Sequence, residues 1–319
     1  MHYAQVQAFG QAPQYLEGPD LPEPAAGQVR LKVLASAVHR LVQMRANGKH
    51  FSATSVPLDP SSDGVGIDEA TGQVYYVSMF AAPMLAEYAN ADIKRLVPIP
   101  AGADPIAVAA LTNPVSSSWL ALTERVHDLK PGFSVLVLGV TGTSGRTAIP
   151  VARKFGAGTI IGAARNEKAL QALVADGSID KYIVLGDADA LSNATAALGH
   201  VDVILDYVYG AAASTVLSAL QTNADGPPTQ YVNIGTIAQE ESISLNAQTL
   251  RAKNLTLAGS APGSYSLTGA GKQVPGIVAL AATLPKPADV VPYALSEVAR
   301  VWDTDEARKK RLVLLPWGQ

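Results

Sequence analysis

Three evenly spaced glycines follow a short apolar run in the middle of the chain. Gly139, Gly142 and Gly145 come directly after residues 135–138, Val-Leu-Val-Leu, and an apolar helical pattern begins at Ser144. Glycines let the backbone turn sharply and approach a pyrophosphate closely, and unpaired N–H groups at the start of a helix face that anion. The spacing therefore favours a dinucleotide-binding turn between a strand and a helix.

Other structures share parts of this pattern. A P-loop needs Gly at position 140 and Lys at position 146, where this chain has Val140 and Arg146. A nucleophile elbow centred on Ser144 also needs Gly at position 146, and a tight turn without a ligand remains an alternative. The dinucleotide turn is favoured because strand, helix and second strand fit within about 30 residues, although its usual form is Gly-x-Gly-x-x-Gly.

The residues after the second strand of this region indicate which dinucleotide is bound. NAD-preferring sites place Asp or Glu there to accept a hydrogen bond from the ribose 2′-hydroxyl. This chain instead has Arg165 and Lys168, and a guanidinium can bind a 2′-phosphate through two hydrogen bonds. These residues predict NADP(H) as the cofactor. The alternative is a pair of ordinary basic residues at the start of a surface helix, where Glu167 is favoured by the helix dipole.

Composition excludes several classes of protein. The 319 residues include no cysteine, so disulfides, thiolate zinc sites, iron–sulfur clusters and cysteine nucleophiles are impossible. The five histidines have none of the spacings of a zinc site, and we expect no bound metal. The net charge is −3, from 24 basic and 27 acidic residues without a long block of one sign, which argues against nucleic-acid or membrane partners.

Length and hydropathy favour a cytoplasmic protein with about two domains. Dividing 319 residues by roughly 150 per domain gives that number. The first residues show no basic segment followed by an apolar stretch, so no signal peptide is recognisable. The longest apolar runs, such as residues 277–284, fall far short of the ~20 residues that cross a bilayer. The lack of cysteine fits a reducing compartment.

Two patterns of hydrophobic residues divide the chain near residue 105. Before it, alternation between turn residues predicts short strands at 28–34, 72–78 and 96–100, and thus a barrel or sandwich. The elements predicted after it are helices at 105–111, 116–126, 144–155, 167–175, 211–220 and 274–284, and strands at 134–138, 159–164, 182–185, 201–205, 230–234, 255–258 and 311–315. Apolar strands that alternate with helices predict an α/β fold, with a parallel sheet covered on both faces.

A series of motifs extends over nearly the whole chain. They are Asp-Gly-Val-Gly at 63–66, Glu-Tyr at 87–88, Leu-Val-Pro-Ile-Pro at 96–100, the segments 109–122 and 129–145, and the strand ends at 202–206 and 232–235. In this order and spacing they resemble the medium-chain dehydrogenase/reductase superfamily, and within it the zinc-free quinone oxidoreductase branch. The resemblance implies a doubly wound Rossmann domain, a GroES-like β-barrel catalytic domain and a homodimer.

The resemblance also implies domain boundaries and roles for individual residues. The β-rich catalytic domain would span 1–118, the dinucleotide-binding domain 119–262, and a segment at 263–319 would return to the catalytic domain. The residues implied for the cofactor are Gly139, Thr141, Gly142, Thr143, Ser144, Gly145, Arg146, Arg165, Lys168, Asn233, Ile234, Gly235 and Ser260. On the substrate side, Asn113 would line the cleft between the domains, and Val38, His39 and Gln43 would face the substrate.

The chain departs from zinc-dependent relatives at the positions where they hold their metal. Those relatives carry a Cys-His pair near residue 38 and a His-Glu pair near residue 63. This chain has Val38-His39 and Ser62-Asp63 there. His39 could donate a proton or a hydrogen bond to a substrate carbonyl, because imidazole titrates near physiological pH. Equally, it could be a structural histidine in a turn.

Together these inferences predict a metal-free, NADPH-dependent oxidoreductase that transfers hydride to a quinone or an activated enone or ketone. Without a metal to polarise a carbonyl oxygen, a small-molecule acceptor that is already electron-poor needs least help from the protein. Asn113 and His39 are the candidate catalytic residues. The alternatives are a non-catalytic NADPH-binding redox sensor or structural protein, and an α/β hydrolase that uses Ser144.

Overall fold

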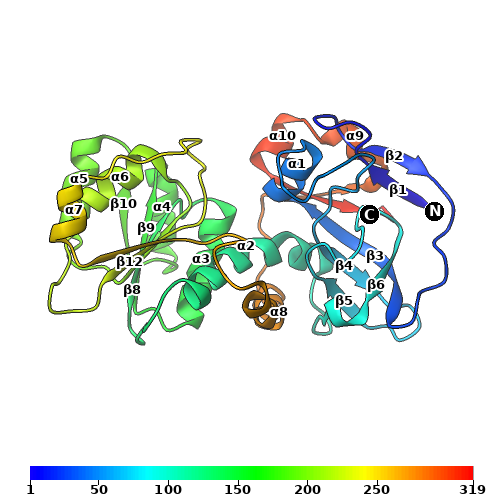
Figure 1. The fold of residues 1–319 in the computed structure, drawn as a ribbon, viewed down its shortest axis with the longest axis horizontal. Coiled ribbons are helices and arrows are strands. Elements are labelled where there is room, and N and C mark those ends of the chain that lie inside the picture. Colours follow the sequence, from blue (N-terminus) through cyan, green and yellow to red (C-terminus); the bar gives the residue numbers. More distant parts are fainter. Residues whose placement is uncertain (319) are drawn as a thin grey trace. The chain divides into compact units, whose positions relative to one another are not determined.

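The structure is a computed structural model that describes residues 1–318, and the chain divides into two compact units. Unit 1 comprises Met1–Asn113 together with the chain from Val274 onward, and unit 2 comprises Pro114–Gln273. In Figure 1 the colours of unit 1 are blue, cyan and red, and those of unit 2 run from green to orange. Both boundaries fall within helices, α2 (Pro105–Glu124) and α8 (Leu267–Ala281).

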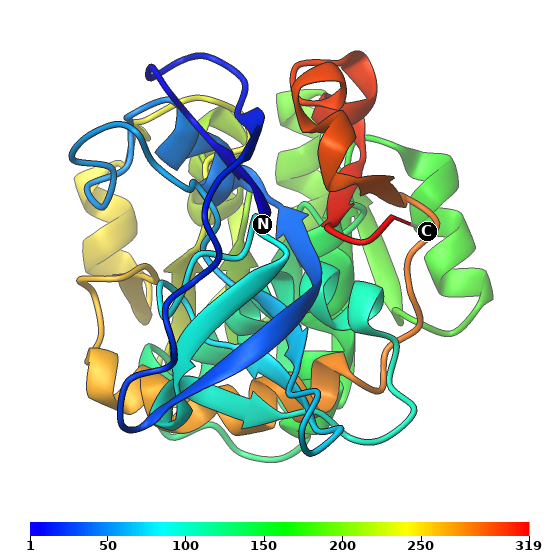
Figure 2. The same cartoon turned by 90° about the vertical axis from the view of Figure 1, so that its right-hand side faces the viewer.

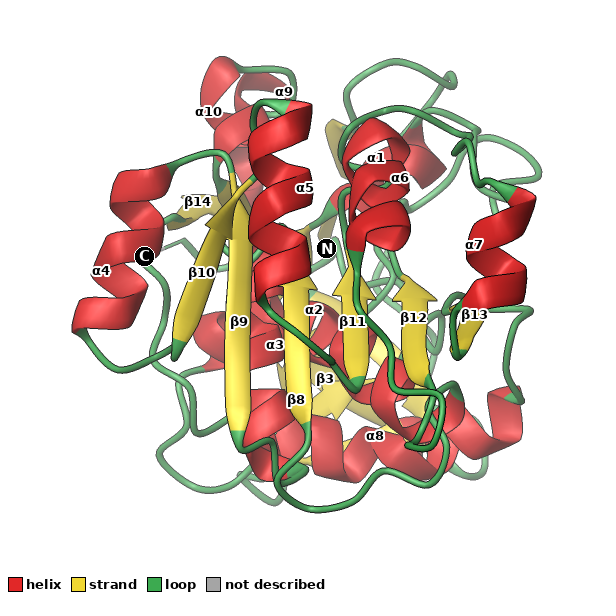
Figure 3. Cartoon of the chain, turned by 90° about the vertical axis from the view of Figure 1, so that its left-hand side faces the viewer, coloured by secondary structure: helices red, strands yellow, loops and turns green. Residues whose placement is uncertain are grey.

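Unit 2 is built on a six-stranded sheet in the order β10-β9-β8-β11-β12-β13, in which all pairings are parallel. Its strands are β8 (Ser134–Leu138), β9 (Thr159–Ala164), β10 (Lys181–Val184), β11 (Val203–Asp206), β12 (Thr229–Asn233) and β13 (Leu255–Gly259). Its helices are α3 (Thr143–Lys154), α4 (Glu167–Ala175), α5 (Ala188–Ala197), α6 (Gly210–Ala219) and α7 (Ala247–Ala252). Figure 3 shows α5 and α6 on one face of the sheet and α3 on the other. The predicted doubly wound parallel sheet is confirmed.

The sheet of unit 2 forms because its strands are apolar on both faces. In β8, every residue after Ser134 is buried, and in β9 every residue after Thr159 is buried. The chain runs outward from β8 through β9 to β10 and then returns to pair β11 with the other side of β8. Such a reversal of strand order is the switch point at which open α/β sheets bind ligands, beyond the carboxyl ends of the strands.

Unit 1 is mostly antiparallel sheet. The order of its larger sheet is β14-β15-β3-β4-β5-β7, with β6 also paired to β3, and β1 and β2 form a separate hairpin. Its strands are β1 (His2–Gln5), β2 (Gln14–Glu17), β3 (Gln28–Val38), β4 (Gly64–Ile67), β5 (Val74–Val77), β6 (Tyr88–Asp92), β7 (Leu96–Pro98), β14 (Val290–Ala294) and β15 (Arg311–Leu315). Its helical segments are α1 (Arg40–Ala46), η1 (Ile93–Arg95), η2 (Leu295–Glu297), α9 (Val298–Val301) and α10 (Asp305–Lys309). In Figure 2, β3 is the long blue arrow.

The prediction of two helices at 105–111 and 116–126 is wrong, because α2 runs continuously from 105 to 124. Pro114 lies inside this helix, where proline removes one backbone hydrogen bond and disfavours the preceding turn. On either side of Pro114, a hydroxyl group donates a hydrogen bond to a carbonyl of the same helix: Thr112 to Val108 (2.8 Å) and Ser117 to Pro114 (2.6 Å). Pro114, which as a helix-breaking residue favoured two separate helices, therefore did not end α2.

Judged by length and composition alone, helix α2 could cross a membrane, and no other helix among the described residues could. However, 72% of its apolar window is buried within the structure. Core helices of globular domains pass the same test, so this helix is weak evidence of a membrane span.

The start of α8 was predicted at residue 274, seven residues after its actual start at Leu267, and β14 was not predicted at all.

Candidate active-site residues in the two units

The glycine turn between β8 and α3 has the close packing that the spacing predicted. Gly139 has a φ of +91°, which favours glycine, and its N–H donates to the carbonyl of Ala163 at the end of β9 (2.8 Å). A Cβ on Gly145 would lie 2.2 Å from the Gly139 oxygen and 2.6 Å from the Val140 Cα. Only glycine lets the helix approach the strand end so closely.

The amino-terminal end of α3 is open to a ligand. Gly142 is the N-cap residue, and no side chain caps the helix there. Uncapped amides in the first turn of a helix, together with the helix dipole, favour an anion. Gly142 and Arg146 are exposed, while Thr141, Thr143 and Ser144 are half-buried. The Arg146 Nε donates to the Thr141 carbonyl (3.2 Å). These residues fit a pyrophosphate.

Four of the predicted cofactor residues gather at neighbouring strand ends. The amides of Ile234 and Gly235 donate to the Asp206 carbonyl at the end of β11, at 2.7 and 3.1 Å. The amide of Ser260, directly after β13, donates to the carbonyl of Asn233 at the end of β12 (2.8 Å). These residues therefore share the carboxyl edge of the sheet with the glycine turn at the end of β8.

Arg165 and Lys168 lie where a 2′-phosphate selector would be expected. Arg165 is the residue directly after β9, two positions beyond the Ala163 carbonyl that accepts from Gly139. Lys168 is in the first turn of α4, which the Asn166 side chain caps by accepting from the amide of Ala169 (3.2 Å). Both basic side chains are exposed. Neither makes a hydrogen bond or ion pair with any residue in 1–318, so their charge is available to an anion.

The sequence analysis missed a buried carboxylate at the same edge. Asp206 is fully buried and accepts hydrogen bonds from the amides of Val208 (2.7 Å) and Tyr209 (3.0 Å) and from the hydroxyl of Tyr231. Burial raises the pKa of Asp206, although these hydrogen bonds oppose the rise. It organises the turn after β11, where Tyr209 has a φ of +64°. The sequence feature that could have revealed Asp206 is an aspartate at the end of an apolar strand.

In unit 1, His39 belongs to a buried hydrogen-bonded cluster. Its Nε2 lies 3.0 Å from Asp63 Oδ1 and 3.0 Å from Ser62 Oγ. Asp63 also accepts hydrogen bonds from the hydroxyls of Ser62 and Tyr76, both at 2.7 Å. The Nδ1 of His39 is buried and has no hydrogen-bond partner among the described residues. One ring nitrogen is therefore held by the protein, and the other has no hydrogen-bond partner within residues 1–318.

The cluster keeps Asp63 ionised. Burial alone would raise the pKa of this carboxyl, but the hydrogen bond and charge of His39, with the hydrogen bonds of Ser62 and Tyr76, lower it overall. Burial and the neighbouring carboxylate raise the pKa of Tyr76 well above its usual value, so it remains a hydrogen-bond donor. Within residues 1–318, no group of three His, Asp or Glu side chains could hold a metal ion.

The other predicted substrate residues also belong to unit 1. Val38 is buried at the end of β3, and Gln43 is half-buried in α1, which begins directly after His39. Asn113 is half-buried in α2 and interacts with other described residues. The structure thus places Val38, His39 and Gln43 in one short segment, with Asn113 on a different element.

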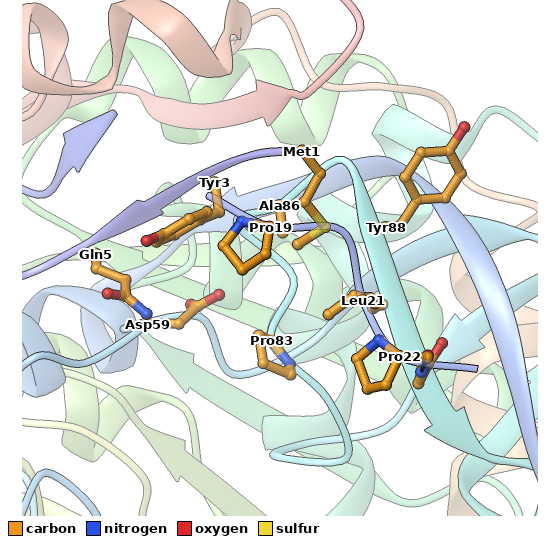
Figure 4. Close-up of a pocket in the computed structure, with 12 residues that line it drawn as sticks. Met1, Tyr3, Gln5, Pro19, Leu21, Pro22, Asp59, Pro83, Ala86 and Tyr88 are labelled. Carbon is orange, nitrogen blue, oxygen red and sulfur yellow. Dashed lines mark hydrogen bonds between the residues drawn. The ribbon is translucent and has the colours of Figure 1, made fainter. Parts of the chain in front are cut away.

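A pocket of about 460 Å³ in unit 1 contains none of the predicted site residues (Figure 4). Its wall is mostly apolar, with polar groups from Tyr3, Gln5 and Asp59. Asp59 accepts hydrogen bonds from the backbone amides of Ser61 and Leu85, which fixes its carboxylate as part of the loop structure. The pocket is therefore separate from the groups that could perform the predicted chemistry.

Comparison with known proteins decides the family. No protein-family model matches the chain. The "Probable NADPH-dependent quinone reductase tdiC" of Emericella nidulans is 37% identical over 361 aligned positions, which cover 99% of this chain and 100% of that protein. The chain belongs to the medium-chain dehydrogenase/reductase superfamily, in its quinone oxidoreductase-like branch. The predicted resemblance is confirmed, and this membership leaves no support for the α/β-hydrolase alternative.

More distant relatives agree with this assignment to the superfamily. The human quinone oxidoreductase is 28% identical over 171 residues, and the match covers 51% of this chain and 51% of that protein. Among solved structures, the quinone oxidoreductase of Thermus thermophilus, studied also in complex with NADPH, has a TM-score of 0.77 and 22% identity. That match covers 99% of this chain and 100% of the other. At this identity the structural likeness shows a shared fold, as the element order predicted.

Proposed function

We propose that this protein is an NADPH-dependent oxidoreductase that transfers hydride to a quinone or an activated enone or ketone. The observation that carries the proposal is the tightly packed glycine turn, which is hydrogen-bonded to the end of β9. An exposed and unpaired Arg165 directly follows that strand. The name of the Emericella nidulans relative supports the same cofactor and acceptor class.

Several of the predicted residues have a role in this reaction. Bound NADPH supplies a hydride, and the acceptor takes up that hydride and one proton to give the reduced acceptor and NADP⁺. The first-turn amides of α3 bind the pyrophosphate, and Arg165 and Lys168 bind the 2′-phosphate. Asn113, and His39 in its doubly protonated form, donate hydrogen bonds to the acceptor oxygen as negative charge develops on it.

The loss of NADPH absorbance with a panel of quinones, enones, ketones and aldehydes tests this function. Quinones and enones should be reduced fastest, because their low-lying empty orbitals accept hydride without a metal. Efficient oxidation of alcohols with NADP⁺, while every quinone and enone stays inert, would show that the assignment is wrong. Tight NADPH binding without any turnover would instead favour the redox-sensor alternative.

Replacing Arg165 with alanine is expected to weaken NADPH binding about 10- to 100-fold, while NADH binding stays nearly constant. A charge-assisted hydrogen bond to a phosphate contributes roughly 1.5–3 kcal/mol, which corresponds to that ratio. Dissociation constants of both nucleotides for the wild type and Arg165→Ala measure the effect. The variant Arg153→Ala is a matched control, because Arg153 is a surface arginine of unit 2 that already pairs with Asp180 (2.7 Å). Equal wild-type affinities for NADPH and NADH would contradict the prediction.

We also propose a cytoplasmic, zinc-free homodimer. Strand β13 is an edge strand of the unit 2 sheet, and Leu257 on it is 41% exposed. Unpaired backbone groups along an exposed edge favour pairing with another chain. Native mass spectrometry should give twice the mass of one chain without the added mass of a metal. The mass of a single chain for both the wild type and Leu257→Lys would contradict the dimer. One zinc ion per chain would contradict metal independence.

A further inference from the structure

An acidic side chain lies within the basic pair that is proposed to bind the 2′-phosphate. Glu167 comes two positions after Arg165 and directly before Lys168, and all three side chains are exposed. A carboxylate at this place opposes a phosphate in two ways, because it repels the phosphate charge and competes with the phosphate for the cations. Within residues 1–318, however, Glu167 makes no ion pair with Arg165 or Lys168.

The carboxylate is instead bound by a tyrosine of the neighbouring strand. The hydroxyl of Tyr182, in β10, donates to Glu167 Oε1 (3.1 Å). Tyr182 pairs in register with Gly162 of β9, and paired residues of parallel strands point to the same face of a sheet. A Cβ on Gly162 would lie 3.5 Å from Leu170 of α4, so this face is the one that α4 covers. The half-buried phenol ring is therefore anchored beside α4, which Figure 3 shows next to β10.

Helix α4 itself offers the Glu167 side chain no other polar contact of this kind. The helix begins at Glu167 behind the Asn166 cap, and an acid in the first turn is favoured by the helix dipole. The residues three and four positions further on, which neighbour it on the helix surface, are Leu170 and Gln171 and carry no positive charge. Among the described residues, Tyr182 is the hydrogen-bond partner of this carboxylate.

We propose that Tyr182 is a positioning residue for cofactor choice, because its hydroxyl holds the Glu167 carboxylate and thereby leaves Arg165 and Lys168 to the 2′-phosphate. This rests on the proposed function, since it concerns the same phosphate site. Without the hydroxyl, the flexible glutamate side chain is free to turn toward Arg165. NADPH then meets a partly neutralised site with a negative charge beside it, whereas NADH, which has no 2′-phosphate, is little affected.

The test compares dissociation constants of NADPH and NADH, measured by fluorescence titration of the full-length protein at low ionic strength. In Tyr182→Phe, the preference for NADPH over NADH should fall about 3- to 5-fold, the size of an interaction between exposed charges. Glu167→Gln alone should change the preference by less than about 2-fold, because the wild-type carboxylate is already bound by Tyr182. The double variant should regain the preference of the wild type. High salt should reduce the effect of Tyr182→Phe, because it screens exposed charges.

The double variant distinguishes positioning from a merely structural role of Tyr182. If the lost hydroxyl acted by distorting α4, the preference would fall equally with glutamate or glutamine at position 167, and the proposal would be overturned. An unchanged preference in Tyr182→Phe overturns it as well, and leaves the proposed function intact. These titrations contain no acceptor, so a fall in Tyr182→Phe that Glu167→Gln reverses supports the proposal even if no quinone is reduced.

Discussion

Replacing Gly145 with alanine is expected to lower NADPH affinity at least about 100-fold and to destabilise the fold by about 3 kcal/mol. The new Cβ would lie 2.2 Å from the Gly139 oxygen and 2.6 Å from the Val140 Cα, and both are backbone atoms. The turn cannot yield easily, because the amides of Gly139 and Val140 both donate to the Ala163 carbonyl. The helix must therefore move away, which costs packing energy and displaces the amides that face the pyrophosphate.

Gly142→Ala separates packing from ligand approach in the same turn. A Cβ at Gly142 would meet only the Gly139 oxygen, at an ordinary contact distance of 3.6 Å, and the φ of −78° suits alanine. Its urea midpoint should fall only slightly, because alanine is a poorer N-cap residue than glycine, while NADPH binding weakens because the methyl group occupies space beside the phosphates. Fluorescence titration with NADPH and urea unfolding measure both quantities. Wild-type affinity in Gly145→Ala would contradict the pyrophosphate assignment for this turn.

The sheet of unit 2 could be predicted because each strand is encoded locally. Strands β8 and β9 and helix α4 begin and end at the predicted residues. A strand buried on both faces is a continuous apolar run, which is recognisable without knowledge of its partners. Arg165 could be placed for the same reason, because it directly follows such a strand. The positions of the glycine turn and of Arg165 therefore followed from short-range patterns, while their part in cofactor binding stays a prediction.

The substrate half depends on contacts between residues far apart in the sequence, which local patterns do not encode. Asp63 and His39 are 24 positions apart, and in the cofactor half the missed Asp206 is 25 positions from its partner Tyr231. Each pair meets because the sheet topology brings strand ends and loops together. The sequence left His39 with both a structural and a catalytic interpretation. The structure shows one ring nitrogen bonded to Asp63 and Ser62 and the other buried without a partner among the described residues, and the catalytic role stays a prediction.

Replacing Asn113 with alanine is expected to lower quinone turnover about 100- to 1,000-fold, with a much smaller change in NADPH affinity. If its side-chain amide donates to the oxygen of the acceptor, the hydrogen bond strengthens as negative charge develops there, and losing one such donor typically has this effect on rate. Steady-state kinetics with a quinone measure kcat, and fluorescence titration measures NADPH binding. The matched control is Thr112→Val on the same helix, because the Thr112 hydroxyl donates only to the Val108 carbonyl. It should leave turnover unchanged.

His39→Gln should show the same pattern as Asn113→Ala if the imidazole delivers the proton. A glutamine amide can still donate to the Asp63 carboxylate, so the buried charge keeps a partner and the variant should fold. It cannot release a proton, so turnover should fall and the pH dependence of kcat should flatten. A purely structural His39 would instead give an unchanged pH profile together with lower stability. Wild-type turnover in both Asn113→Ala and His39→Gln would show that neither side chain stabilises the reduced oxygen.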